Sequence, residues 1–399
     1  MNPAKENPRR VAIVAAGVVS PLGFGLTETL TSLIEARDCV TPVTAFSVDK
    51  TRCKTAAQID DGRLLENAKR TRQERRLHRA SHMVIAAMAE LVENAPGFSP
   101  EIAIVGTTSG GMSFGENFYR SLGKADACCA ALIANYPPQK QIIDAMQKLG
   151  VNVPAEVIAN ACASGTNAIG HAFNAIRIGR YQSILAGGYD ALSELVFVGF
   201  DSLQAATPEK CRPFDSHRSG MVLGEGAALV ALEELESARN RGAEIIAEMI
   251  GYGISTDNHH LTQPNPDGNG PRRAMEQALA QARLAPEQVG YINAHGTATI
   301  LNDAAEGKAI AELFGPVPVS STKSMMGHSL GAAGAIEAVV TLLTLQHQLL
   351  PPNINFRASD LPLNIVANHA EDARFDCAVS NSFGFGGTNA TIVFKRFVR

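Results

Sequence analysis

"ANACASGTNAIGHAFNAI", residues 159–176, places a short polar turn between two apolar stretches. The β-branched residues just before the turn predict a strand, and the small and apolar residues after Gly165 predict a buried helix. Cys162 lies at the junction, where the free N–H groups of a helix start favour a thiolate and lower its pKa. Cys162 is therefore either a nucleophile or a small buried side chain, and this stretch alone does not decide.

A second segment, "VSSTKSMMGHSLGAAGAIEAVVTLL" at residues 319–343, repeats the order of strand, polar loop and small-residue helix. Three further pairs of segments match each other, and all four pairs occur in the same order along the chain. These pairs are 11–21 with 246–257, 102–111 with 290–299, and 224–235 with 386–397. The alternation of strands and helices predicts an α/β fold of two pseudo-symmetric halves, residues 1–243 and 244–399.

Composition limits the function classes. Of 399 residues, 45% are hydrophobic and 19% are charged, which predicts a large core. The net charge of −4 argues against general nucleic-acid binding. The seven cysteines are irregularly spaced without a CxxC pair, which argues against a disulfide framework or a structural zinc site. No apolar run reaches the roughly 20 residues of a membrane span, so we expect a cytoplasmic protein.

The second half of the chain contains further candidate catalytic residues. "NAHGTAT" places His295 after a predicted strand, and "TKSMMGHSLGAAG" places Lys323 and His328 in a loop before a helix. Pseudo-symmetry would bring these loops to the Cys162 loop, because α/β proteins build sites at the carboxyl ends of strands. Two neutral imidazoles could donate hydrogen bonds to a developing oxyanion or enolate. A catalytic zinc held by Cys162, His295 and His328 is the less favoured alternative, because no two ligands have the usual close spacing.

The C-terminal segment "NSFGFGGTNA", residues 381–390, is rich in glycine. Its glycines would let backbone N–H groups approach a ligand, with Phe385 as an apolar gate. A glycine-rich β-turn with a buried phenylalanine is the alternative. The segment lacks the GxGxxG register of a nucleotide site.

In this order, "ACASG", "RPFDSHRSGMVLGEGA", "NAHGTAT", "STKSMMGHSLGAAGA" and "NSFGFGGTNA" resemble β-ketoacyl-acyl-carrier-protein synthases of the thiolase fold. The resemblance covers nearly the whole chain and implies a layered α-β-α-β-α core. It implies that Cys162 accepts an acyl group from the phosphopantetheine arm of an acyl carrier protein. Malonyl-carrier would then lose CO2, and its carbanion would attack the acyl-cysteine. No metal or organic cofactor is implied, and the partner would be a second copy or a chain-length-factor-like homologue.

The same resemblance implies individual roles. Backbone N–H groups of Cys162 and Phe385 would form an oxyanion hole, and the two histidines would bind the malonyl thioester carbonyl. Lys323 would pair with the carboxylate of Glu306. The residues that would contact the pantetheine arm are Thr297, Thr299, Phe385 and Gly386.

The substrate is less defined. The family often has "HGTGT" or "HGTST" followed by Gly-Asp, whereas this chain has "HGTATILND", with Ala298 and Asn302. Segments 107–122 and 194–215 resemble synthases of aryl polyene pigment clusters. Housekeeping fatty-acid elongation is the alternative. A coenzyme A-dependent thiolase would carry a second cysteine in the C-terminal glycine-rich loop, and a non-catalytic chain-length factor would lack Cys162.

A basic run, "KRTRQERRLHRASH" at residues 69–82, is either a docking face for an acidic carrier protein or a solvated helix face. The docking residues would be Arg70, Arg72, Arg75, Arg76 and Arg79.

Overall fold

The computed structural model describes residues 8–66, 76–122 and 130–398. In the first half the strands lie in the order β1-β8-β7-β5-β6, and in the second half in the order β9-β16-β15-β10-β11-β13. Their bounds are β1 Val11–Ser20, β5 Ile102–Gly106, β6 Ala155–Ile158, β7 Ser183–Asp190, β8 Gly226–Glu234, β9 Ala247–Thr256, β10 Tyr291–Asn293, β11 Pro318–Ser320, β13 Asn364–Ile365, β15 Cys377–Gly384 and β16 Thr388–Arg396.

The two halves repeat one topology. In each half the first two ladders are antiparallel and the next two are parallel, so β1-β8-β7-β5-β6 corresponds to β9-β16-β15-β10-β11. The four repeated sequence segments fall on corresponding strands. The predicted pseudo-symmetry of the halves is therefore confirmed.

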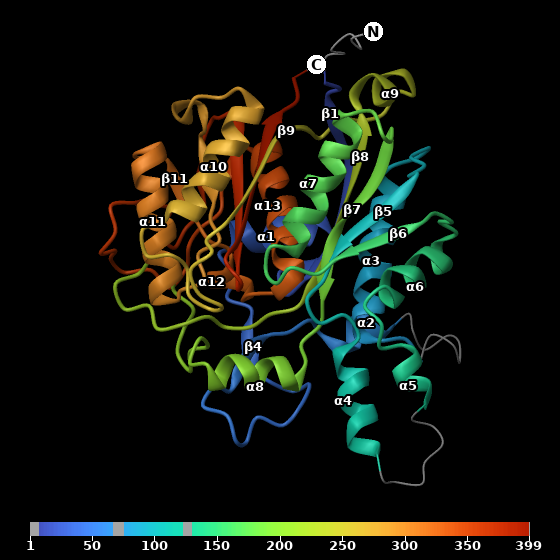
Figure 1. The fold of residues 1–399 in the computed structure, drawn as a ribbon, viewed down its shortest axis with the longest axis vertical. Coiled ribbons are helices and arrows are strands. Elements are labelled where there is room, and N and C mark those ends of the chain that lie inside the picture. Colours follow the sequence, from blue (N-terminus) through green and yellow to red (C-terminus); the bar gives the residue numbers. More distant parts are fainter. Residues whose placement is uncertain (1–7, 67–75, 123–129, 399) are drawn as a thin grey trace.

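Helices form three layers around the two sheets. Helices α7 (Ser164–Arg177) and α13 (Ala333–His347) pack on each other in the middle layer, between the sheets. Helices α3 (Arg79–Asn94) and α6 (Lys140–Leu149) cover the first sheet, and α10 (Asn269–Ala282) and α11 (Ile300–Phe314) cover the second (Figure 1). This is the predicted α-β-α-β-α core.

A short antiparallel ladder joins the sheets, because Val11, Ala12 and Ile13 of β1 pair with β9. The boundary between residues 243 and 244 stays a prediction about domains, since both halves share the middle helix layer. One stretch of the described residues, Leu330–His347, is long and apolar enough to cross a membrane, but 89% of it is buried inside the protein. It contains α13, which explains why that helix is apolar on every side.

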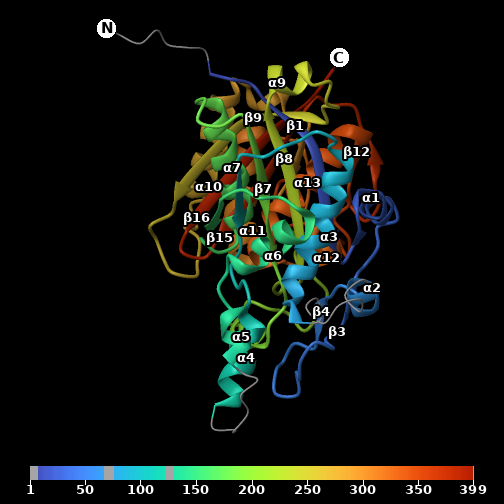
Figure 2. The same cartoon turned by 90° about the vertical axis from the view of Figure 1, so that its right-hand side faces the viewer.

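Further elements extend from one end of this core. Helices α4 (Met112–Ser121), α5 (Ala130–Ala134) and α8 (Glu194–Ser202) lie beyond the ends of the sheets (Figures 1 and 2). The shorter elements are β2 Gly23–Phe24, α1 Leu26–Ile34, β3 Val40–Pro42, β4 Thr55–Ala57, α2 Asp61–Glu66, α9 Leu235–Asn240, α12 Lys323–Met326, β12 Leu349–Leu350 and β14 Glu371–Asp372. The loops after β6, β10, β11 and β15 carry the predicted site residues, so the topology brings those residues together.

Candidate active site

Cys162 sits in a tight turn between β6 and α7. The helix begins at Ser164, two residues later than the thiol, because Ala161 adopts a left-handed φ of 58°. The Ser164 hydroxyl fastens this turn by donating to the Ala161 carbonyl at 2.6 Å and accepting from the Asn160 N–H at 2.9 Å. The glycine-rich segment 381–390, which we call the gate loop, approaches this turn closely, since a Cβ on Gly384 would lie 3.1 Å from the Cys162 nitrogen. The thiol is held at the base of the site.

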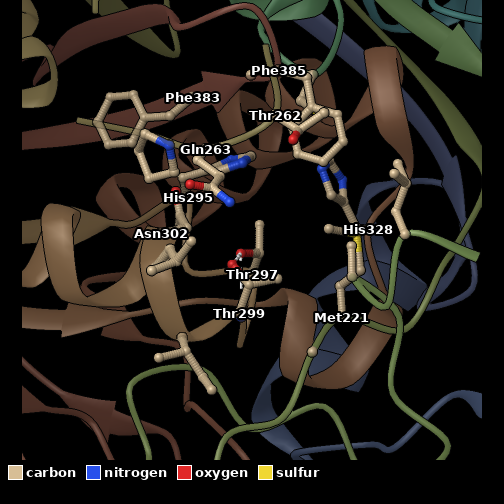
Figure 3. Close-up of a pocket in the computed structure, with 18 of the residues that line it drawn as sticks. Met221, Thr262, Gln263, His295, Thr297, Thr299, Asn302, His328, Phe383 and Phe385 are labelled. Atoms are coloured by element: carbon tan, nitrogen blue, oxygen red, sulfur yellow. Dashed lines mark hydrogen bonds between the residues drawn. The ribbon is translucent and has the colours of Figure 1, made fainter. Parts of the chain in front are cut away.

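His295 and His328 meet Cys162 from the other half of the fold. One ring nitrogen of each histidine and the Cys162 Sγ all lie within 4.8 Å of one another. The two imidazole rings meet edge to face, with centroids 5.3 Å apart (Figure 3). The predicted convergence of these three side chains is present in the structure.

Hydrogen bonding assigns the tautomers of both histidines. Lys323 Nζ lies 3.3 Å from His295 Nδ1, and a lysine ammonium can only donate. The N–H of Leu330 donates to His328 Nδ1 at 3.2 Å. Each Nδ1 is therefore an acceptor, so each Nε2 carries the proton. Within the described part of the chain, the buried Nε2 of His328 has no hydrogen-bond partner.

Both imidazoles are neutral. Burial lowers the pKa of His295 and of His328 well below the ordinary value, and the nearby positive charge of Lys323 lowers both further. Neutral imidazoles with protonated Nε2 atoms are hydrogen-bond donors to a substrate oxygen. Neither ring can act as a base through Nε2 in this state.

Lys323 is fully buried and forms its ion pair with Glu337 of α13. The expected pairing of Lys323 with Glu306 was wrong. Glu306 instead accepts hydrogen bonds from the backbone N–H groups of His295 and Gly296, both at 2.8 Å. Glu306 thus orients the loop that carries His295, because its carboxylate binds the backbone N–H groups of that loop. The Glu306 side chain does not point to Lys323.

Sequence reasoning missed Glu337. The available signal was a lone acidic residue in the apolar stretch "AGAIEAVVTLL" of residues 333–343. A charge inside such a helix requires a partner. Burial raises the pKa of both Glu337 and Glu306 to about 7, opposed for Glu337 by Lys323 and for Glu306 mainly by the two backbone N–H groups.

The expectation of a lowered thiol pKa was also wrong. Burial raises the pKa of Cys162 to about 11, because it outweighs the opposing effects of Lys323 and the Phe385 N–H. Hydrogen bonding from the backbone N–H groups of Phe385 and of Cys162 itself lowers this pKa in part. The resting site therefore holds a thiol, next to two backbone donors.

A cavity of about 280 Å³ leads from the surface to Cys162. Thr297 and Thr299 line it with hydroxyls 2.8 Å apart, because Ala298 between them has a left-handed φ of 64° (Figure 3). Phe385 also lines the cavity, and its ring stacks on Phe200 of α8 at 5.5 Å.

Gly386 differs from the other predicted pantetheine contacts. Its N–H donates to the Leu261 carbonyl at 2.7 Å, so this amide is already used within the protein. Gly386 is not among the residues that line the cavity, whereas its neighbours Gly387 and Phe385 are.

Comparison with known proteins identifies the family. Models described as the N-terminal and the C-terminal domain of β-ketoacyl synthase match residues 8–238 and 246–357. The chain belongs to the β-ketoacyl synthase family. A 3-oxoacyl-[acyl-carrier-protein] synthase 2 from Synechocystis is 36% identical over 99% of this chain and 100% of its own length.

Solved ketosynthase structures resemble the whole chain. The ishigamide ketosynthase/chain length factor has a TM-score of 0.90 and 33% identity, covering 98% of this chain and 100% of that one. A ketosynthase (ApeO) in complex with its chain length factor (ApeC), from Xenorhabdus doucetiae, has a TM-score of 0.82 and 27% identity, covering 98% of each chain. This ketosynthase therefore has the thiolase-type fold expected from its motifs.

The family defines the reaction. The enzyme is a 3-oxoacyl-carrier-protein-forming acyltransferase that condenses an acyl group with a malonyl unit and releases CO2, in fatty-acid or polyketide elongation.

The predicted docking arginines have different surroundings. Arg70, Arg72 and Arg75 lie outside the described residues, and Arg76 is exposed. Arg79 is largely buried, because its guanidinium donates to both carboxylate oxygens of Glu225 and also contacts Asp61. Arg79 is thus a structural cation at the start of α3 and is not available to a carrier protein.

Proposed function

We propose that this ketosynthase elongates an aryl-polyenoyl or related chain held as a thioester on Cys162. The arrangement of Cys162 beside two Nε2–H donors in a narrow cavity carries the chemical part of this proposal. The resemblance of residues 107–122 and 194–215 to aryl polyene synthases supports the substrate class.

In the first half-reaction, the Cys162 sulfur attacks the thioester carbonyl of an acyl-carrier. The N–H groups of Cys162 and Phe385 stabilise the oxyanion, and each such donor contributes about 3–4 kcal/mol to catalysis. The carbon–sulfur bond to pantetheine breaks as the bond to Cys162 forms. The proton of the Cys162 thiol ends on the released pantetheine thiol, which balances the exchange.

In the second half-reaction, malonyl-carrier places its thioester oxygen against Nε2–H of His295 and His328. Loss of CO2 leaves an electron pair that these two donors stabilise as an enolate. The enolate carbon attacks the acyl-cysteine carbonyl, and the oxyanion again lies at the Cys162 and Phe385 N–H groups. Collapse forms the new carbon–carbon bond and expels the Cys162 thiolate, which then regains a proton.

The proposal uses no metal or organic cofactor. Both Nδ1 atoms already accept hydrogen bonds, and both Nε2 atoms are protonated and serve as donors. We propose a reducing cytoplasmic location, in agreement with the free thiols of the five cysteines in the described segments.

The proposed partners are an acyl carrier protein and a second subunit, either another copy or a chain-length-factor-like homologue. The ishigamide and Xenorhabdus doucetiae structures each include a chain length factor. Light scattering of the purified chain tests this point. A stable monomer with full activity would contradict the dimer.

Intact mass tests the function. The enzyme is incubated with short saturated, long saturated and aryl-polyenoyl carriers, with Cys162→Ala as the control. We expect an acyl adduct that is absent from the control and largest for the aryl-polyenoyl carrier. A preference for saturated chains would assign the enzyme to fatty-acid elongation, and an adduct on Cys162→Ala would refute the nucleophile.

A further inference from the structure

A fully buried carboxylate, that of Asp190 at the end of β7, connects the two halves of the molecule. Five hydrogen-bond donors reach it at 2.7–2.8 Å, and each is a backbone N–H or a hydroxyl. Four of them belong to the loop after β5, namely the Thr107 hydroxyl, the Thr108 N–H, and the N–H and hydroxyl of Ser109. The fifth is the Gly331 N–H, from the second half. A buried carboxylate with so many donors fixes each segment that binds it.

One oxygen, Oδ2 of Asp190, joins the halves directly. It accepts from the Thr108 N–H at 2.8 Å and from the Gly331 N–H at 2.7 Å. A Cβ on Gly331 would lie 2.6 Å from the Thr108 nitrogen and 2.7 Å from Oδ2. The backbone at residue 331 therefore reaches the carboxylate only because it carries no side chain.

Gly331 ends the segment that holds the ring of His328, residues 328–331, which we call the His328 turn. Leu330 has a left-handed φ of 54°, and its N–H donates to His328 Nδ1 at 3.2 Å. The backbone of His328 is fixed elsewhere, since its N–H donates to the Val222 carbonyl at 2.7 Å and its carbonyl accepts from the Gly224 N–H at 2.9 Å. The bond at Gly331 therefore acts on the ring of His328 and not on the position of its backbone.

The Cys162 turn depends less on Asp190. The Thr108 hydroxyl donates to the Ala161 carbonyl at 3.2 Å. The same carbonyl also accepts from the Ser164 N–H at 3.1 Å and from the Ser164 hydroxyl at 2.6 Å. Two of these three bonds would remain if the loop after β5 moved.

We propose that Asp190 is a positioning residue for the malonyl half-reaction, because it holds the His328 turn and thereby the orientation of the His328 ring. The inference rests on the proposed function, in which Nε2–H of His328 binds the malonyl thioester oxygen. Without the bond at Gly331, the Leu330 N–H would leave Nδ1, and the ring could rotate and carry its proton on either nitrogen. A donor displaced from the enolate oxygen stabilises it less.

Two variants break the same hydrogen bond from opposite ends. Asp190→Ala removes the acceptor. Gly331→Ala keeps the carboxylate and its other four donors, but the new Cβ would push the Gly331 N–H away from Oδ2. Asp144→Ala is the matched control, because Asp144 is also a buried aspartate, bound to the Ser81 hydroxyl at 2.8 Å, but lies in α6 of the outer helix layer.

The two half-reactions should respond differently. Release of CO2 from malonyl-carrier should fall about 10–100-fold in kcat for both variants, with KM changed less than about twofold. Acylation of Cys162, followed by intact mass, should change less than about threefold, because the turn keeps its Ser164 bonds. The control should match the parent enzyme in both steps.

Nitrogen NMR of enzyme with isotope-labelled histidine gives a readout that a general loss of stability would not move. The ring signals of His328 are identified by their absence from His328→Ala. We expect these signals to shift in Asp190→Ala and in Gly331→Ala, because Nδ1 loses the Leu330 N–H, and to stay in place in the control.

Parental decarboxylation or unshifted His328 signals in either folded variant would overturn the inference, as would an equal loss in both half-reactions. If Asp190→Ala does not fold, Gly331→Ala decides, since it keeps the carboxylate and four of its five donors. If the parent enzyme elongates only saturated chains, the proposed substrate class fails, while decarboxylation and the His328 signals still test Asp190.

Discussion

At the scale of single residues, the thiol of Cys162 is subject to two opposing influences. Burial raises its pKa to about 11, and the charge of Lys323 lowers it. We predict that alkylation of Cys162 by iodoacetamide accelerates about tenfold per pH unit between about pH 7 and pH 9, without a plateau. Mass spectrometry of the alkylated peptide gives the rate, and a plateau near neutral pH would contradict the buried-thiol description.

The contribution of Lys323 can be isolated by removing its ion pair as a unit. Lys323→Met alone would leave Glu337 buried without a partner, which destabilises a protein by about 3–5 kcal/mol. The double variant Lys323→Met/Glu337→Met avoids this problem. It should fold, and Cys162 should be alkylated more slowly at each pH because the cation that favours the thiolate is gone. Equal or faster alkylation in the folded double variant would show that Lys323 does not act on Cys162.

The two histidines should act in the malonyl half-reaction and not in acylation. His328→Ala removes one Nε2–H donor and leaves the oxyanion-hole N–H groups in place. We predict a fall of about 10²–10³-fold in malonyl decarboxylation, with acylation of Cys162 nearly unchanged. Release of CO2 and intact mass report the two steps separately. Loss of acylation in folded protein would assign His328 to the first step instead.

The sequence predicted the catalytic side chains better than the residues that pair with them. Cys162, His295 and His328 follow predicted strands, so strand order alone brings them together. The pairing of Lys323 with Glu306 came from the family resemblance, and the actual partner, Glu337, depends on which side of α13 faces the site. The pKa of Cys162 depends on burial, which no local pattern shows.

At the scale of elements, the contact between β5 and the start of α7 permits no side chain at Gly106. A Cβ there would lie 2.2 Å from the carbonyl carbon of Ser164, two residues after Cys162. We predict that Gly106→Ala destabilises the protein by about 1–3 kcal/mol and slows acylation, because the Cys162 turn must move. Thermal unfolding and intact mass measure the two effects.

Gly199 of α8 provides the control. It has ordinary helical surroundings, and a Cβ there meets no atom of the described residues within 4 Å. Gly199→Ala should stabilise the protein by about 0.5–1 kcal/mol, through the better helix propensity of alanine. Similar losses in both variants would argue against a specific contact at Gly106.

Element boundaries were less predictable than element order. The repeated segments identified corresponding strands, because β-branched runs ending in glycine turns recur in both halves. The helix expected from Gly165 begins one residue earlier, at Ser164, and no sequence pattern indicated that Ala161 before it adopts a left-handed conformation that alanine rarely takes. Helices α4 and α5 have no counterpart among the four repeats, so the repeat could not predict them.

At the scale of the whole molecule, several carboxyl groups are buried in the second half of the chain. The carboxyl pKa is raised to about 7 for Glu306 and Glu337 and to about 6 for Asp303, in each case chiefly by burial. The folded protein therefore keeps protons that the unfolded chain has released. The stabilisation from these groups is complete below their unfolded pKa and is lost as the pH rises through the folded pKa.

The buried histidines act in the opposite direction at lower pH. The pKa of His295 and of His328 is lowered, so the unfolded chain binds protons that the folded protein does not. Their contribution to stability is complete above about pH 6.5 and declines as the pH falls below that value. Between about pH 6.5 and pH 8 the carboxyl groups of Glu306 and Glu337, with a pKa of about 7, titrate in the folded protein.

We therefore predict that the free energy of unfolding falls as the pH rises from about 6.5 to 8, by about 1 kcal/mol for each carboxyl group with a pKa near 7. Glu306→Gln tests the origin of this slope. The variant should be less stable at every pH, since an amide cannot accept from both the His295 and the Gly296 N–H. Its stability should nevertheless fall less steeply with pH, because one titrating group is gone. Urea unfolding at several pH values gives both quantities, and an unchanged slope in the variant would show that Glu306 is already ionised in the folded protein at the lower pH.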